Sequence, residues 1–217
     1  MLSLNKNTIL CFDLDNTLYV NSDLNDAILS KIKEYLLMHV KETEIDIILN
    51  EFSLEHGSTL RGLIKNKQVH PLSYLEYIHN IDVENYLKKD RNLLSILNSI
   101  ECKKVILTNS YRPYTNKVLQ CLGIKSAFPD TSIFDVESMG YYYKNDVKSF
   151  RFFFRKTNFE PKNCILFDDQ CANLDIAKKM NMKTVLVSGE NYEPNDYDGW
   201  IKSIHQLSQL EMPLKIE

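Results

Sequence analysis

An apolar run ends abruptly in two carboxylates, one residue apart, in the stretch Ile9-Leu10-Cys11-Phe12-Asp13-Leu14-Asp15-Asn16-Thr17-Leu18-Tyr19. The run is short and continuous, which predicts a strand buried on both faces. In open α/β sheets, the carboxyl ends of such strands face the crevice where ligands bind. We therefore expect Asp13 and Asp15 to lie at a functional site, where a cation or a shared proton relieves their mutual repulsion.

The composition is that of a globular protein with a sizeable core, with 44% hydrophobic and 25% charged residues in a chain of 217. A formal net charge of -3 gives no basic field, so we expect no nucleic-acid partner. The sequence contains no membrane-length apolar stretch, and we expect neither a signal peptide nor a membrane partner. The five cysteines are odd in number and never spaced as Cys-x-x-Cys, which favours a reduced, cytoplasmic protein.

Helical periodicity dominates the part of the chain that follows the first strand. Apolar residues recur at helical spacing from Leu24 to His56, after a polar helix start at 21–23 and before a stop at Gly57. Pro71 opens a further helix. Because nothing in this part alternates as a strand, we predict an all-helical cap domain over residues 20–95. The catalytic core would then comprise residues 1–19 and 96–217.

The rest of the chain alternates between strands and helices. Strong buried strands are expected at 105–110, 164–169 and 184–187, and a short, poor strand at 131–136. Helices are expected between them, with a closing helix from Trp200 to Leu210. Strands that alternate with helices predict an α/β fold with a parallel, doubly wound sheet.

Two of these strands end in acids, since Asp168 and Asp169 end the strand at 164–169 as Asp13 and Asp15 end the first. Right-handed crossovers bring the carboxyl ends of parallel strands to one edge of the sheet. Four carboxylates there make a hard, oxygen-rich site that suits Mg²⁺. Two acidic pairs at two strand ends are hard to explain as helix caps alone. A calcium loop is excluded, because its sixth position is Leu18 and its twelfth is Leu24.

A carboxylate beside a metal can also act as a nucleophile toward phosphorus. The charge on the phosphoryl oxygens then needs neutralising, and Lys144 and Thr108 are suited to that task. A second acid two residues on can protonate the leaving oxygen and later deprotonate water. Taken alone, Lys144 would be read as a solvated surface residue; the order of the four elements changes that reading.

Four segments resemble, in order, the motifs of the haloacid dehalogenase-like (HAD) hydrolase superfamily. Asp13-Leu14-Asp15-Asn16-Thr17 resembles the first, and Val105-Ile106-Leu107-Thr108-Asn109 the second. Gly140-Tyr141-Tyr142-Tyr143-Lys144 is similar to the third, and Phe167-Asp168-Asp169 with the following helix to the fourth. The resemblance implies a Rossmann-like three-layer core, Mg²⁺ as cofactor and an aspartyl-phosphate intermediate.

On that pattern Asp13 would be the nucleophile and Asp15 the acid/base. Asp13, the Asp15 main-chain carbonyl and Asp168 would hold the metal, with Asp169 behind them. Thr108 and Lys144 would grip the phosphoryl group. The acid at position 15 argues for a phosphatase, because a departing halide needs no proton.

Two departures from the superfamily pattern are visible. Asn145 stands where Pro usually follows the motif lysine, and Asn173 stands where a late acid is usual. The first removes a fixed φ angle and the second leaves Asp168 and Asp169 to carry the metal side alone.

The cap resembles that of the type 1 subclass, and 56–63 is similar to a stretch in pyrimidine 5′-nucleotidases. His56 and Arg61 lie in this stretch, and we expect them to bind substrate together with Asn16 and Asn109. Arg61 pairing with a neighbouring helix is an equally weighted alternative.

The sequence thus predicts a Mg²⁺-dependent phosphomonoesterase, most consistent with a 5′-nucleotidase that acts on pyrimidine nucleoside monophosphates as a monomer or homodimer. One alternative keeps the chemistry and takes a sugar phosphate or phosphoglycolate as the small-molecule substrate. A more distant one is a receiver-like phospho-aspartate signalling module, although such modules lack a large helical insert. A scaffold without catalysis has no support, because every required side chain is present.

Overall fold

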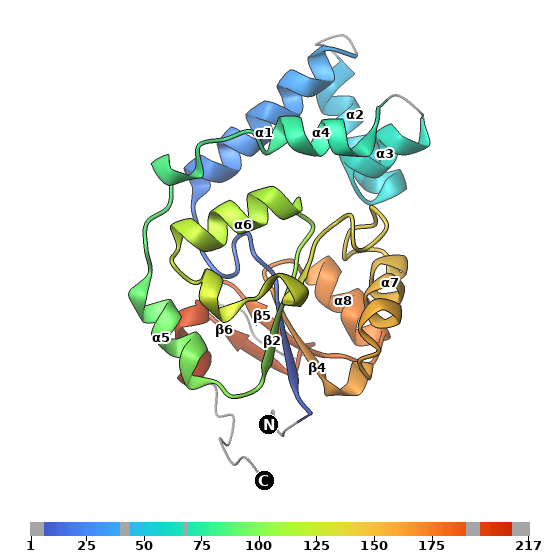
Figure 1. Ribbon diagram of the computed structural model, residues 1–217. Helices are drawn as coiled ribbons and strands as arrows, with labels where there is room; N and C mark the ends of the chain where they lie inside the picture. Colours follow the sequence, from blue (N-terminus) through green and yellow to red (C-terminus); the bar gives the residue numbers. More distant parts are fainter. Residues whose placement is uncertain (1–6, 40–43, 67–68, 190–195, 210–217) are drawn as a thin grey trace.

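Six parallel strands form one sheet in the order β3-β2-β1-β4-β5-β6 (Figure 1). The computed structural model describes residues 7–39, 44–66, 69–189 and 196–209. β1 (Ile9–Phe12) lies in the middle, where Cys11 pairs with Val105 on one side and Leu166 on the other. The other strands are β2 (Lys103–Leu107), β3 (Ile133–Phe134), β4 (Cys164–Asp168), β5 (Lys183–Val187) and β6 (Gly199–Ile201).

Helices cover both faces of the sheet, as the alternation of side chains along β1 requires. Leu10 and Phe12 pack with α5 (Arg91–Ser99) and α6 (Arg112–Cys121), whereas Ile9 and Cys11 pack with α7 (Val147–Thr157) and α8 (Cys171–Lys179). Both faces of β1 are therefore buried, which explains its unbroken apolar sequence. The predicted three-layer α/β fold is confirmed.

Four helices sit above the carboxyl edge of the sheet (Figure 1): α1 (Ser22–Leu37), α2 (Ile45–His56), α3 (Thr59–Lys65) and α4 (Pro71–Ile78). The Asn21 side chain caps α1 by accepting from Leu24 N at 2.8 Å, and Ser58 caps α3 in the same way. These helices share an apolar cluster of their own, which we call the cap cluster: Tyr35, Leu36, Ile45, Phe52, Leu60, Leu63, Tyr74, Leu75, Ile78 and the core residue Val136.

The next segment packs differently, because Ile81, Val83 and Leu87 join the cluster on the α5 and α6 face of the sheet. This segment includes the short helix η2 (Val83–Asn85). The division of the chain at residue 95 stays a prediction, and from this packing we propose a junction nearer to residue 80.

The predicted closing helix from Trp200 to Leu210 is wrong. Trp200 and Ile201 instead form the edge strand β6, where they pair with Leu186 and Val187, and a 3-10 helix, η6 (Ile204–Gln209), follows. Leu210 lies outside the described residues. Three further 3-10 turns connect the core elements: η3 (Lys125–Ala127), η4 (Asp130–Ser132) and η5 (Pro161–Asn163).

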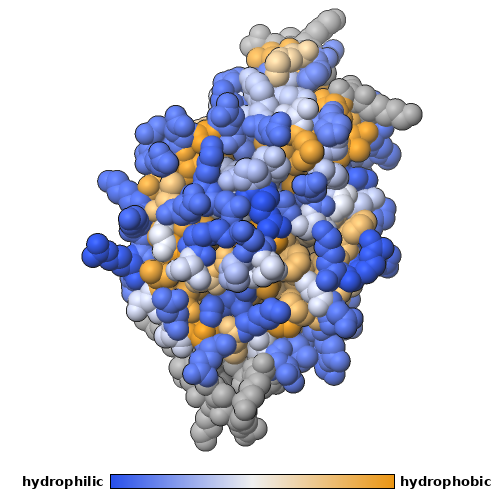
Figure 2. All heavy atoms as spheres, in the orientation of Figure 1, coloured by the Kyte–Doolittle hydropathy of each residue, from blue (hydrophilic) through white to orange (hydrophobic). Residues whose placement is uncertain are grey.

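The surface is mixed in polarity, with hydrophobic patches over the helices that carry the cap cluster (Figure 2). Several large apolar side chains of α1 and α2 are exposed, with Leu54 at 87% and Ile47 at 56%. Among the described residues, no helix combines the length and hydropathy that crossing a membrane requires.

Candidate active site

The loop after β1 turns sharply and points its carboxylates in different directions. Asp13 N donates to Phe167 O at 2.9 Å, which extends the ladder between β1 and β4 by one residue. Asn16 then takes a left-handed conformation at φ 62°, which Asn tolerates better than most residues. Leu18 N bonds back to Leu14 O at 3.0 Å and closes the turn. Asp13 is consequently buried at the sheet edge, while Asp15 faces another side of the turn.

A buried lysine lies between two of the carboxylates. Nζ of Lys144 lies 2.5 Å from Oδ1 of Asp13 and 2.6 Å from Oδ2 of Asp168. The Lys144 side chain is fully buried, and Asn109 Oδ1 anchors its backbone by accepting from Lys144 N at 2.9 Å. Burial alone would lower the pKa of Lys144, but Asp13 and Asp168 together raise it above its usual value. The ammonium is thus a fixed positive charge at the centre of the site.

One positive charge does not balance the acids around it. Burial, opposed by Lys144 and aided by Asp168 and Asp15, raises the pKa of Asp13 well above its usual value. Burial and the neighbouring Asp168 raise the pKa of Asp169 to about 6. Ligand atoms of Asp13, Asp168 and Asp169 lie within 4.8 Å of one another. This crowded set of hard oxygens fits Mg²⁺, which such carboxylates hold together with water and phosphate oxygens.

Residues around Asp168 fix its orientation. Gln170 N and Asn173 Nδ2 both donate to Asp168 Oδ1 at 2.9 Å, which leaves Oδ2 for Lys144. Asn173 is buried, so the position where an acid was expected instead supplies a neutral donor. Thr17 Oγ1 similarly donates to Asp13 Oδ2, at 3.3 Å.

Asp15 does not belong to this group of acids, because hydroxyls hold its carboxylate. Tyr19 and Tyr114 donate to its Oδ1, the latter at 3.1 Å, and Ser110 Oγ donates to its Oδ2 at 2.5 Å. Burial and Asp15 raise the pKa of both tyrosines, so both hydroxyls keep their protons at neutral pH. Asp15 was predicted among the metal ligands; its side chain points elsewhere, and the role of its main-chain carbonyl stays a prediction.

Thr108 directly follows β2 and is buried. Because β2 is the neighbour of β1 in the sheet, Thr108 lies beside the strand end that carries Asp13. Its Oγ1 accepts from Ser110 N at 3.0 Å, which leaves the hydroxyl proton for another acceptor. Of the two predicted substrate-binding asparagines, Asn109 holds the Lys144 backbone and Asn16 Oδ1 accepts from Asn25 Nδ2 at 2.7 Å. Asn25 lies on α1, so Asn16 links the loop to the helices above it.

The predicted cap residues lie on α2 and α3. The guanidinium of Arg61 stacks on the ring of Tyr142, 3.9 Å from its centroid. Tyr142 belongs to the loop that carries Lys144, so Arg61 reaches the core beside the site. His56 packs against Phe52 and its Nε2 lies 3.8 Å from Glu55, and within the described ranges no contact joins it to Asp13, Asp168 or Asp169. Asn145, which replaces the usual Pro, donates to Gly57 O at 2.8 Å. This bond makes a second link between the helices above the sheet and the loop that carries Lys144.

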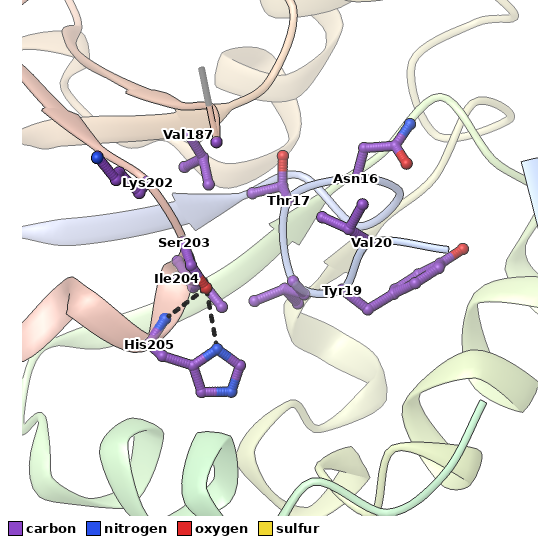
Figure 3. A pocket seen from close by; sticks show the side chains of 11 residues that line it. Asn16, Thr17, Tyr19, Val20, Val187, Lys202, Ser203, Ile204 and His205 are labelled. Carbon is purple, nitrogen blue, oxygen red and sulfur yellow. Dashed lines mark hydrogen bonds between the residues drawn. The ribbon is translucent and has the colours of Figure 1, made fainter. Parts of the chain in front are cut away.

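A hollow of about 240 Å³ lies beside the first loop (Figure 3). The loop residues Asn16, Thr17 and Tyr19 line one side, and Ser203 and His205 line the other. Ser203 Oγ lies 3.0 Å from Nδ1 of His205, whose Nε2 lies 2.8 Å from Asp90. Asp90 also caps α5 through Leu93 N, so this chain of bonds ties η6 to α5.

Sequence reasoning missed the groups that hold Asp15 and Asp168. Tyr19 was seen only as the end of a motif, although its spacing of four residues from Asp15 could have indicated a contact across one turn. Tyr114 and Ser110 gave no comparable signal, because a helix start and a loop place them. Asn173 was noted as a departure, but its hydrogen bond to Asp168 was not foreseen.

The chain is similar to known proteins in sequence and in fold. The model of a hydrolase family, the haloacid dehalogenase-like hydrolases, matches residues 8–181. The chain is 28% identical over 199 residues to Phosphate metabolism protein 8 of Saccharomyces cerevisiae, which covers 84% of this chain. The match spans 62% of that yeast protein, less than two thirds of its length.

Solved structures of similar fold include the following two. YfnB from Bacillus subtilis, bound to magnesium, has a TM-score of 0.56 and 17% identity, and the match covers 94% of this chain and 98% of that one. A HAD phosphatase from Thermococcus onnurineus has a TM-score of 0.61 and 16% identity, with 93% and 96% covered.

Proposed function

Since the chain belongs to the haloacid dehalogenase-like hydrolase family, we propose that it is a Mg²⁺-dependent phosphomonoesterase that works through an aspartyl-phosphate on Asp13. The observation that carries this proposal is the buried Lys144 ammonium between Asp13 and Asp168, with Asp169 beside them. Such a cluster places a nucleophilic carboxylate next to the positive charge that a phosphoryl group needs.

Different residues of the chain carry out the successive steps of the reaction. Lys144 and the Thr108 hydroxyl bind the phosphoryl oxygens. Asp13, Asp168 and Asp169 would hold Mg²⁺, which would supply further positive charge. An oxygen of Asp13 attacks phosphorus, the ester P–O bond breaks, and Asp15 gives a proton to the departing oxygen. Asp15 then takes a proton from water, the water oxygen attacks phosphorus, and phosphate leaves with Asp13 restored.

The helices above the site support a nucleoside monophosphate as substrate. Arg61 presents a guanidinium on the Tyr142 ring beside the Lys144 loop, and a planar cation on an aromatic face suits a base or sugar hydroxyls. The resemblance of 56–63 to pyrimidine 5′-nucleotidases favours pyrimidine bases. A sugar phosphate or phosphoglycolate is the second candidate, because Arg61 would equally meet the far end of a smaller anion.

A phosphate-release screen tests the activity and the substrate class together. Purified protein is incubated with pyrimidine and purine nucleotides, sugar phosphates and phosphoglycolate, with Mg²⁺ or with EDTA. We expect release that depends on Mg²⁺ and is fastest for the pyrimidine nucleotides, and we expect Asp13→Asn to abolish it. Substantial turnover by Asp13→Asn would remove Asp13 as the nucleophile, and a preference for sugar phosphates would select the second candidate.

The role of Arg61 has a matched control on the same helix. Arg61→Ala should raise KM for the preferred nucleotide about tenfold, the worth of one charge-assisted contact, and leave p-nitrophenyl phosphate unaffected. Lys65→Ala removes an exposed cation of α3 and should change neither value. Equal effects of Arg61→Ala on both substrates would contradict the assignment.

The compartment and assembly remain as predicted from the sequence. All five cysteines are free thiols, which supports the reduced cytoplasm as the compartment. We also propose that the protein is a monomer or homodimer and that its partner is a small-molecule phosphate ester.

A further inference from the structure

The carboxylate of Asp15 is held by three hydroxyls that the reaction described above does not use. A carboxylate has about four lone-pair positions, two on each oxygen. Tyr19 and Tyr114 both contact Oδ1, while Ser110 is the one residue of the described part of the chain that contacts Oδ2. Oδ1 is therefore closed by protein donors, and Oδ2 keeps one position free.

We propose that Tyr19 and Tyr114 are positioning residues that hold Asp15 by Oδ1 and thereby make Oδ2 the oxygen that exchanges protons with substrate and water. This inference rests on the proposed phosphatase activity and specifies how its acid/base is aimed.

The position of Ser110 indicates that Oδ2 faces the phosphoryl group. Ser110 follows β2 by three residues, and its backbone N–H donates to Oγ1 of Thr108. Thr108 is the proposed phosphoryl contact, so the oxygen that meets Ser110 lies on that side of Asp15. Oδ1 instead meets tyrosines that are buried in the cluster on the α5 and α6 face.

The two tyrosines differ in how directly they act. Their hydroxyl oxygens lie 2.9 Å apart, so two protons serve three contacts: Tyr19 to Asp15, Tyr114 to Asp15 and Tyr19 to Tyr114. The shortest contact joins Tyr19 to Asp15 and takes the Tyr19 proton. The Tyr114 proton is then shared between Asp15 and Tyr19. Tyr19 is thus the primary holder of Asp15, and Tyr114 supports it.

Tyr19 and Tyr114 are themselves held in place, as a positioning role requires. Tyr114 is 1% exposed and Tyr19 8%. The ring of His79, which follows α4, packs on Tyr114 with centroids 4.6 Å apart. Core residues, together with His79 at the end of the helical segment above them, therefore fix the orientation of the Asp15 carboxylate.

The experiment compares esters that differ in their need for an acid. An alkyl phosphate such as uridine monophosphate needs a protonated leaving oxygen, whereas p-nitrophenolate leaves without one. We expect Tyr19→Phe to lower kcat for the alkyl ester about tenfold or more, with KM within twofold, and to leave kcat for p-nitrophenyl phosphate nearly unchanged. Tyr114→Phe should show the same pattern with a smaller loss.

Tyr74→Phe is the matched control, because Tyr74 is a buried tyrosine of the cap cluster that lies away from Asp15. It should leave both esters as in the wild type, and thermal melts check that all three variants fold. If Tyr19→Phe does not fold, Tyr114→Phe carries the test.

Three outcomes would overturn the inference. Equal losses on both esters would give the tyrosines a purely structural role, and no loss on either would remove them from the reaction. A gain on the alkyl ester would identify Oδ1 as the working oxygen. Failure of the proposed function is distinguishable, because the wild type would then release phosphate from neither ester and the inference would fall with it.

Discussion

At the scale of single residues, Lys144 is the side chain whose environment is most demanding. A fully buried ammonium is tolerated because two carboxylates surround it at 2.5 and 2.6 Å. Lys144→Met keeps the approximate volume and removes the charge, which leaves Asp13 and Asp168 buried without a cation. We expect this change to lower the free energy of unfolding by about 3–5 kcal/mol in EDTA, measured by urea denaturation.

The control for that measurement is Lys148→Met, which removes an exposed lysine four residues further on. It should shift the urea midpoint very little, since exposed charges contribute about 0–1 kcal/mol. A Lys144→Met protein as stable as the wild type would mean that the acids relax or take up protons without cost, and that the buried pairings contribute no net stability.

His79 gives the molecule a predicted acid sensitivity. Burial lowers its pKa from 6.5 to about 4, and its Nδ1 lies 2.9 Å from Leu75 O. As the pH falls from 7 toward 4, the unfolded chain binds a proton at this residue and the folded chain does not, so stability is lost over that window. The difference between the two pKa values corresponds to about 3 kcal/mol.

Replacing the ring with one that cannot titrate should remove this loss. His79→Phe keeps an aromatic ring against Tyr114, and its unfolding free energy should fall less between pH 7 and pH 4 than that of the wild type. His70→Phe, at an exposed histidine, should leave the wild-type pH dependence in place. Parallel pH curves for the wild type and His79→Phe would refute this account.

At the scale of elements, the packing of α2 on α3 depends on one glycine. A Cβ on Gly62 would lie 2.2 Å from Cγ of Phe52, so the two helices approach through a position that has no side chain. Gly62→Ala should therefore cost about 1–3 kcal/mol through displacement of the Phe52 ring, despite the better helix propensity of alanine. Gly189→Ala has open space and should be nearly neutral. A Gly62→Ala protein that melts like the wild type would contradict this packing.

Elements with a strong local signal were predictable, and short edge elements were not. β1 and β4 are buried on both faces, and their unbroken apolar runs therefore predict them as strands. β6 has three residues, and its Trp200 and Ile201 also fit a helical pattern. Pairing with β5, which is a tertiary interaction, decides in favour of the strand.

At the scale of the whole molecule, the topology explains which parts of the site the sequence could predict. Parallel strands with right-handed crossovers must bring their carboxyl ends together, so the meeting of Asp13 and Asp168 follows from the order of elements. Lys144 joins them from the loop between β3 and α7, where Asn109 holds its backbone. Tyr114 reaches Asp15 across 99 positions from the first turn of α6, and nothing in the local sequence marks that contact. Such contacts set the direction in which each carboxylate points, so this direction could not be predicted from the sequence.

The same convergence links metal binding to the stability of the entire fold. Asp13 and Asp168 follow or end the adjacent strands β1 and β4, so the acids lie together only when the central sheet is formed. A cation that binds this folded arrangement and not the unfolded chain must stabilise the protein, by about 2.7 kcal/mol at a hundredfold excess over Kd. We expect Mg²⁺ to raise Tm in a concentration-dependent way.

Asp168→Asn should abolish that rise, because it removes a charge from the group of acids, whereas Asp26→Asn, on the exposed side of α1, should retain it. An equal Mg²⁺ response from all three proteins would place the cation elsewhere on the molecule. Since the measurement needs no substrate, it tests the assembly of the acids independently of the proposed reaction.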